Sequence, residues 1–156
     1  MLKQPEDPVM IIACPHCAGL NRLPQQRLTQ QPKCGSCKQS LFTGKPVEVT
    51  MANFANLSQK SDLPLVLDFW ASWCGPCQSF APTFVQAAAE LEPGFRFGKV
   101  NTEAEQELAA QFQIRSIPTL MLIQRGKVIA QLSGALPKAQ FYQWLQQHSA
   151  QLQQAE

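Results

Sequence analysis

Residues 47–150 alternate between strand-like and helix-like hydrophobic patterns. Residues 65–70 (Leu-Val-Leu-Asp-Phe-Trp) form a near-continuous apolar run, which is the pattern of a strand buried on both faces. We predict further strands at residues 47–50, 95–101, 119–124 and 127–133, the last two as a hairpin. Helices are expected at residues 53–60, 75–91, 103–112 and 137–154. Asn53 is expected to cap the first of these helices.

The order of these elements predicts an α/β fold. Strands that alternate with helices form a sheet with helices on both faces, and the first connections are right-handed crossovers. The closing hairpin adds an antiparallel pair, so the central sheet is expected to be mixed.

The first 45 residues have a different pattern. Cysteines occur in pairs between residues 9 and 40, and prolines and glycines interrupt any long element there. We expect loop-like structure in this region and a short linker at residues 41–46. The sequence therefore predicts two parts, a small module with its linker at residues 1–45 and a larger domain at residues 46–156.

Composition and charge are consistent with a folded protein. The chain has 156 residues, of which 45% are hydrophobic and 15% charged, with a net charge of +2. Residues 1–45 carry six Lys or Arg and two acidic residues, whereas the remainder carries seven and nine. A basic module can meet nucleic acid or an acidic protein. We favour an ordinary solvated surface and do not expect nucleic-acid binding.

The N-terminal sequence has acids and prolines where a secretion signal needs a basic start and a long apolar stretch. No apolar run approaches the ~18 residues of a membrane helix. We therefore expect a cytoplasmic protein with no membrane partner. In that reducing compartment, six cysteines indicate metal ligands or redox catalysts more than structural disulfides.

Cys74-Gly-Pro-Cys77 directly follows the buried strand and opens a helix. Two cysteines in a first helical turn can close into a disulfide, and the N-terminus of a helix stabilises a thiolate. Cys74 is thus expected to be the attacking sulfur and Cys77, one turn in, the more shielded one. Pro76 suits the first turn because its missing N–H has no helical partner there. The alternatives are two inert buried cysteines or half of a metal site.

The segment from Asp68 to Cys77 (Asp-Phe-Trp-Ala-Ser-Trp-Cys-Gly-Pro-Cys) resembles the active-site segment of the thioredoxin family. Ile114-Arg-Ser-Ile-Pro-Thr119 resembles its cis-proline loop, and Gly134-Ala-Leu also fits. The resemblance covers roughly residues 47–150. It implies the thioredoxin fold and a protein-disulfide reductase. Cys74 then attacks a substrate disulfide and Cys77 resolves the mixed disulfide.

The resemblance also implies roles around the dithiol. Asp68 resembles the buried carboxylate that helps to deprotonate the second cysteine. The alternative for Asp68 is a structural carboxylate paired with Lys99, which the resemblance places nearby. Pro118 resembles the cis-proline, although an ordinary trans turn is the alternative. The residues expected to contact substrate are Trp73, Gly75, Pro76, Ile117, Pro118 and Gly134.

The remaining cysteines form the pairs Cys14-Pro-His-Cys17 and Cys34-Gly-Ser-Cys37, separated by sixteen residues. Two such pairs predict one tetrahedral Zn²⁺ site with four cysteine ligands. The first pair also resembles the active turn of oxidising periplasmic thiol proteins. We disfavour that alternative because we expect neither a buried strand before it nor a helix after it. Two disulfides are disfavoured by the expected compartment.

A four-cysteine module ahead of a thioredoxin domain resembles the zinc-containing thioredoxins of bacteria, the thioredoxin 2 family. This implies recharging by an NADPH-dependent thioredoxin reductase, electron donation to enzymes such as ribonucleotide reductase, and a role in oxidative stress. One alternative is a redox-sensing adaptor whose zinc thiolates control binding to a partner protein. An oxidase or isomerase is a third possibility.

Overall fold

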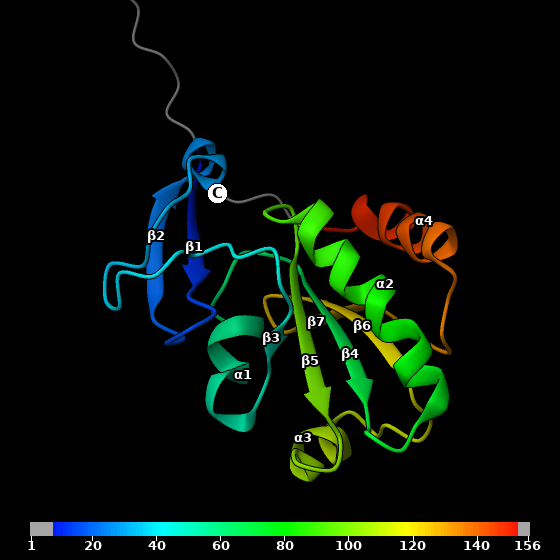
Figure 1. Ribbon diagram of the computed structural model, residues 1–156. Helices are drawn as coiled ribbons and strands as arrows, with labels where there is room; N and C mark the ends of the chain where they lie inside the picture. The colour runs from blue at the N-terminus through cyan, green and yellow to red at the C-terminus, as the bar shows by residue number, and fades with distance from the viewer. Residues whose placement is uncertain (1–7, 153–156) are drawn as a thin grey trace, which may run out of the picture.

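The computed structural model describes residues 8–152. Their central feature is a five-stranded mixed sheet of order β3-β5-β4-β6-β7 (Figure 1). The strands are β3 (Val47–Glu48), β5 (Arg96–Asn101), β4 (Leu65–Trp70), β6 (Thr119–Gln124) and β7 (Lys127–Ser133). The first three are parallel, whereas β6 and β7 run antiparallel to their neighbours. The predicted mixed sheet is confirmed.

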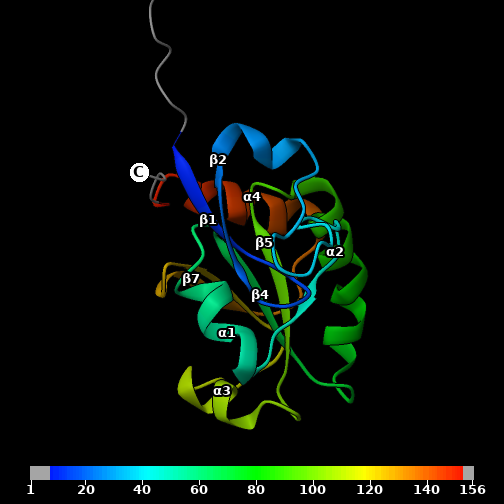
Figure 2. The same cartoon turned by 90° about the vertical axis from the view of Figure 1, so that its left-hand side faces the viewer.

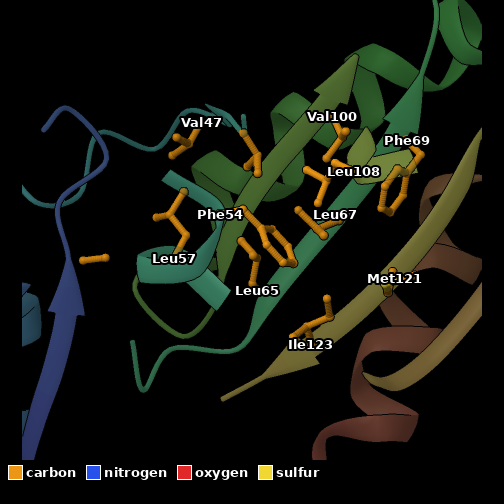
Figure 3. Close-up of a cluster of buried hydrophobic side chains, with 12 residues drawn as sticks. Val47, Phe54, Leu57, Leu65, Leu67, Phe69, Val100, Leu108, Met121 and Ile123 are labelled. Atoms are coloured by element: carbon orange, nitrogen blue, oxygen red, sulfur yellow. The ribbon is translucent and has the colours of Figure 1, made fainter. Parts of the chain in front are cut away.

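Helices cover both faces of this sheet (Figure 1). One face packs against α1 (Met51–Ser58) and α3 (Gln106–Gln111), the other against α2 (Gly75–Leu91) and α4 (Lys138–Ser149). Figure 3 shows the first of the two cores, where Phe54 and Leu57 of α1 meet Leu65 and Leu67 of β4. No helix among the described residues is long and apolar enough to cross a membrane.

Two helix starts differ from the sequence prediction. Thr50, not Asn53, caps α1: its Oγ1 accepts from the N–H of Ala52, while Asn53 Oδ1 accepts from the N–H of Thr50. The prediction of Asn53 as cap is thus wrong, because Asn53 is the second partner of a capping box. Helix α3 begins only at Gln106, because a turn on the Asn101 side chain precedes it. The last helix was predicted over residues 137–154, but it ends at Ser149 and residues 150–152 form a turn; residues 153 and 154 lie outside the described part of the chain.

The N-terminal module contains a hairpin that the sequence analysis missed. Strands β1 (Val9–Ala13) and β2 (Leu20–Pro24) pair antiparallel, followed by a 3-10 helix at Gln25–Thr29. The expectation of no buried strand before Cys14 is therefore wrong, since β1 ends there with Ile12 and Ala13 fully buried. Turns, not a helix, follow Cys17. We keep the division of the chain at residues 45/46 as a prediction.

The module packs beside α1 at the end of the sheet where β4 begins. Ile11 and Asp62 exchange two hydrogen bonds, and Leu63 lies in the same buried cluster as Ile12 and Leu41. Figure 2, seen from the module side, shows β1, β2 and α1 in front of the sheet. The dithiol follows the opposite end of β4. The six residues of β4 separate the two ends by roughly 20 Å.

The buried side chain of Arg96 links the module and its linker to the sheet by hydrogen bonds. Arg96, at the start of β5, donates to the carbonyl oxygens of Leu41 (2.8 Å) and Ala13 (3.0 Å). It also pairs with Glu92 at 3.3 Å, and both side chains are almost fully buried. Glu92 in turn accepts from the N–H of Gly44. The linker at 41–46 is therefore part of the packed structure.

Arg96→Met is expected to lower the free energy of unfolding by about 3–5 kcal/mol, because it leaves Glu92 buried without its partner. Urea unfolding of the full chain measures this. The matched control is Arg115→Met, which removes an exposed arginine and should change stability by less than about 0.5 kcal/mol. Equal unfolding midpoints for Arg96→Met and wild type would show that the contacts of Arg96 do not stabilise the fold.

Candidate redox site and four-cysteine cluster

The dithiol occupies the N-terminus of α2. Cys74 is the N-cap residue, and its Sγ accepts from the N–H of Cys77 at 3.2 Å. The two cysteines are joined by a disulfide. Gly75 and Pro76, between them, are exposed, and Pro76 lies in the first turn as the sequence predicts. A thiolate on Cys74 would face the free N–H groups and positive end of the helix dipole.

The expected difference in exposure between the two cysteines is absent in the disulfide form. Cys74 is 4% exposed and Cys77 is 3% exposed. Each sulfur covers part of the other when they are bonded. What distinguishes the cysteines here is position, because Cys74 precedes the helix and Cys77 lies inside its first turn.

The loop before β6 lies against the dithiol. The Ile117–Pro118 peptide bond is cis, and the Ile117 carbonyl oxygen is 3.7 Å from Cys74 Sγ. Gly134 donates its N–H to the Pro118 carbonyl oxygen at 2.9 Å, with a φ of +120° that favours glycine. Trp73 is 72% exposed beside them. The structure thus brings Cys74, Ile117, Pro118 and Gly134 together next to an exposed aromatic ring.

Glu103 is a contributor to the site that the sequence analysis missed. Its Oε1 accepts from both the N–H (3.0 Å) and the Oγ (2.7 Å) of Ser72, and these bonds lower the pKa of Glu103. Gln78 donates to the Ser72 carbonyl oxygen at 3.2 Å. The turn that carries Trp73 is therefore held from two sides. No local pattern links residues 31 positions apart in the chain.

Asp68 is buried beneath the site without a hydrogen-bond partner for either carboxylate oxygen. Burial raises the pKa of Asp68 to about 7, although the charge of Lys99 opposes the increase. Lys99 does not form a close ion pair with it. The ammonium group lies 4.7 Å from the centre of the Trp70 ring instead.

This buried carboxyl group makes stability depend on pH. The pKa of Asp68 in the folded chain, about 7, is above the usual carboxyl value of about 3.9, so the cost of burying this group grows between about pH 4 and pH 7 and is fully present above pH 7. Asp68→Asn is therefore expected to stabilise the protein by about 2–4 kcal/mol at about pH 8, and far less at about pH 5. Urea unfolding at both values measures this, with Glu107→Gln, an exposed carboxylate on α3, as control. An equal effect at both values would contradict the buried titration.

The other four cysteines form two knuckles of the same geometry. In each, the first cysteine accepts a backbone hydrogen bond from the residue after the second cysteine, Ala18 or Lys38. These two residues have positive φ angles of 63° and 67°, which the sequence analysis did not foresee. Backbone N–H groups of His16, Gly19 and Ser36 point at cysteine sulfurs. N–H groups of Cys37 and Ser36 lower the pKa of Cys34 to about 6.

The four sulfurs fit a tetrahedral metal ion. All four Sγ atoms, of Cys14, Cys17, Cys34 and Cys37, lie within 4.8 Å of one another. The pairs Cys14–Cys37 and Cys17–Cys34 are each 3.7 Å apart. A tetrahedron with Zn–S bonds of about 2.3 Å has edges of about 3.8 Å. The donor set and its spacing therefore match Zn²⁺.

Comparison with known proteins agrees with both halves of this description. The thioredoxin family model matches residues 45–147, and the model described as "Thioredoxin 2, N-terminal" matches residues 13–39. Thioredoxin C-3 of Corynebacterium nephridii is 45% identical over 144 residues, which are 92% of this chain and 99% of the relative. The putative thioredoxin 2 of Streptomyces coelicolor is 47% identical over 93 residues, 60% of this chain and 68% of that protein. The chain belongs to the thioredoxin family of protein-disulfide oxidoreductases, with a thioredoxin 2 zinc-ribbon region ahead of the thioredoxin domain.

Proposed function

We propose that the chain reduces disulfide bonds in other proteins. The Cys74 thiolate attacks one substrate sulfur, forms a mixed disulfide and releases the other substrate sulfur as a thiolate. The Cys77 thiolate then attacks Cys74 Sγ, which releases the second substrate thiolate and leaves the Cys74–Cys77 disulfide. The observation that carries this proposal is a disulfide at the start of α2 with the cis-proline loop against Cys74.

Asp68 is the proposed acceptor of the Cys77 proton. It lies on the face of the sheet that α2 covers, and both oxygens are free of hydrogen bonds. A carboxyl group with a pKa of about 7 exchanges protons readily near neutral pH. Lys99, beside Trp70, is proposed to favour the ionised carboxylate.

The surface around Cys74 is proposed to bind an extended segment of the substrate protein. Trp73 offers an exposed aromatic contact, and the exposed Gly75-Pro76 turn leaves space above the disulfide. Nothing lies within 4 Å of a side-chain carbon placed at Gly75 or Gly134. Ile117 and Pro118 supply backbone beside the sulfur that attacks.

The four-cysteine cluster is proposed to hold one Zn²⁺ ion. The ion would cross-link the two knuckles, and this cross-link would stabilise a module with few apolar residues. The N–H groups directed at the sulfurs stabilise their thiolate forms.

For recharging, we propose an NADPH-dependent thioredoxin reductase, as family membership implies, and the cytoplasm as location. Four cysteines outside the dithiol are unbridged, which suits a reducing compartment. Ribonucleotide reductase and other disulfide-forming reductases are candidate substrates. The family match favours this reductase function over the zinc-thiolate adaptor.

Turnover of insulin disulfides by the full chain, with NADPH and a thioredoxin reductase, tests the proposal. The expected result is NADPH oxidation that requires both the chain and insulin. An assay without insulin controls for direct oxidation. If the reduced chain leaves insulin disulfides intact, the proposed function is wrong.

A further inference from the structure

Three charged residues form a row across the sheet beside the dithiol. Glu48 on β3 is the register partner of Lys99 on β5, and Lys99 is the register partner of Asp68 on β4. Register partners on parallel strands point to the same face. The strand neighbours Val47 and Leu67 lie in the core on the α1 side, so the row lies on the α2 side. The order across the sheet is acid, base, acid.

The row leads from solvent into the protein. Glu48 is exposed, Lys99 is half-buried and Asp68 is fully buried. A cleft of about 320 Å³ runs beside the outer part of the row, and its lining includes Glu48, Lys99, Trp70 and Asn101. The Lys99 ammonium group lies over the Trp70 ring in this cleft and makes no close ion pair with the buried carboxylate.

We propose that Glu48 is a positioning residue that shares the Lys99 ammonium group with Asp68 and favours its position toward the mouth of the cleft. This inference rests on the proposed role of Asp68 as proton acceptor, because it names what controls that carboxyl group. When the Lys99 ammonium group lies toward the mouth of the cleft, Asp68 retains its proton more readily. When the ammonium group lies closer to Asp68, the ionised form of the Asp68 carboxylate is favoured.

Few other charges face Asp68 in the described part of the chain. Its register partner on β6 is the apolar Leu120, and the buried residues of α4 are Phe141, Trp144 and Leu145. The buried residues of α2 include Cys77, which can titrate only when reduced, and otherwise Phe80, Phe84, Ala87 and Ala88. In the disulfide form, Lys99 and Glu48 are thus the charged groups in position to act on Asp68.

The sign of the effect follows from two contributions that agree. Removing the Glu48 charge takes away a repulsive charge two strand spacings, roughly 10 Å, from Asp68. It also frees Lys99 to approach Asp68. Both changes favour ionised Asp68, so its titration should move to lower pH, by about half a pH unit.

Carbon NMR of the Asp68 carboxyl group in the oxidised full chain tests this proposal. The oxidised form avoids coupling to the cysteine thiols. Glu48→Gln is expected to lower the titration midpoint by about half a pH unit, which is about threefold in proton affinity. Glu107→Gln, on the opposite face, removes the same charge and should leave the midpoint unchanged.

Lys99 must mediate most of the change. In a Lys99→Met background, Glu48→Gln is expected to produce less than half of its effect in the wild type. An unchanged midpoint in Glu48→Gln, or an equal change with and without Lys99, would overturn the proposal. The NMR midpoint does not depend on turnover. A chain that fails to reduce insulin but shows the expected midpoints therefore rejects the proposed function and retains the sharing of Lys99.

Discussion

Cys74→Ser is expected to abolish reduction of insulin disulfides, whereas Cys77→Ser is expected to accumulate mixed disulfides with protein substrates. The two variants stop the reaction at different steps. Without Cys74 no attacking sulfur remains at the N-terminus of α2, and without Cys77 nothing resolves the adduct. We expect turnover to fall at least a thousandfold in both, as typical for loss of a covalent nucleophile.

Mass spectrometry under non-reducing conditions measures the adducts. The matched control is the double variant Cys74→Ser/Cys77→Ser, which should form no adduct at this site. If adducts accumulate in Cys74→Ser but not in Cys77→Ser, the assigned order of attack is reversed. Such an outcome would leave the dithiol in place and exchange the roles of its two sulfurs.

Loss of the four-cysteine cluster is expected to remove the metal and unfold the N-terminal module. The variant that replaces Cys14, Cys17, Cys34 and Cys37 with serine should contain no zinc, whereas the wild type is expected to contain about one ion per chain. NMR signals of the β1–β2 hairpin should lose their dispersion. Insulin turnover should change by less than about threefold, because the cluster and the dithiol lie at opposite ends of β4.

Ser36→Ala is the matched control for the metal experiment. Ser36 lies in the second knuckle and is exposed, and its backbone N–H to Cys34 Sγ is kept in the variant. It should bind zinc as the wild type does. A quadruple variant that retains its zinc would rule out the cluster as the metal site.

Local sequence patterns were sufficient for the elements that surround the dithiol. The bounds of β4, α2, β6 and β7 match their predictions. Strand β4 has a continuous apolar run, α2 has a proline in its first turn, and a two-residue turn joins β6 to β7. The cysteines at the start of α2 follow from their motif, and the cis bond at Pro118 follows from the resemblance of residues 114–119 to the thioredoxin cis-proline loop. These signals lie within a few residues of the atoms that they place.

The N-terminal hairpin could not be predicted in this way. Strand β1 has only five residues, and its partner β2 contains the polar Asn21 and Arg22. Ile12 and Leu23 are buried because Leu41 and Leu63 complete their cluster from other parts of the chain. A local pattern contains no information on such partners.

The charged residues gave the largest differences between sequence and structure. Arg96 lies in a strand and is buried because carbonyl groups 55 and 83 residues away accept its hydrogen bonds. Lys99 lies beside Asp68 as expected, because the two are register partners, but its ammonium group lies over the Trp70 ring and forms no close ion pair with the carboxylate. The contact of Glu103 with Ser72 likewise joins two turns that only the folded sheet brings together.

Two of the six cysteines are assigned to disulfide exchange and four to metal binding. Alkylation of the native reduced chain, followed by thiol counting and zinc analysis of the same sample, tests this assignment most directly. We predict fast labelling of Cys74, slower labelling of Cys77 and protection of the four cluster cysteines, with about one zinc per chain. Rapid labelling of the cluster cysteines in zinc-loaded protein, or protection of Cys74, would contradict the account.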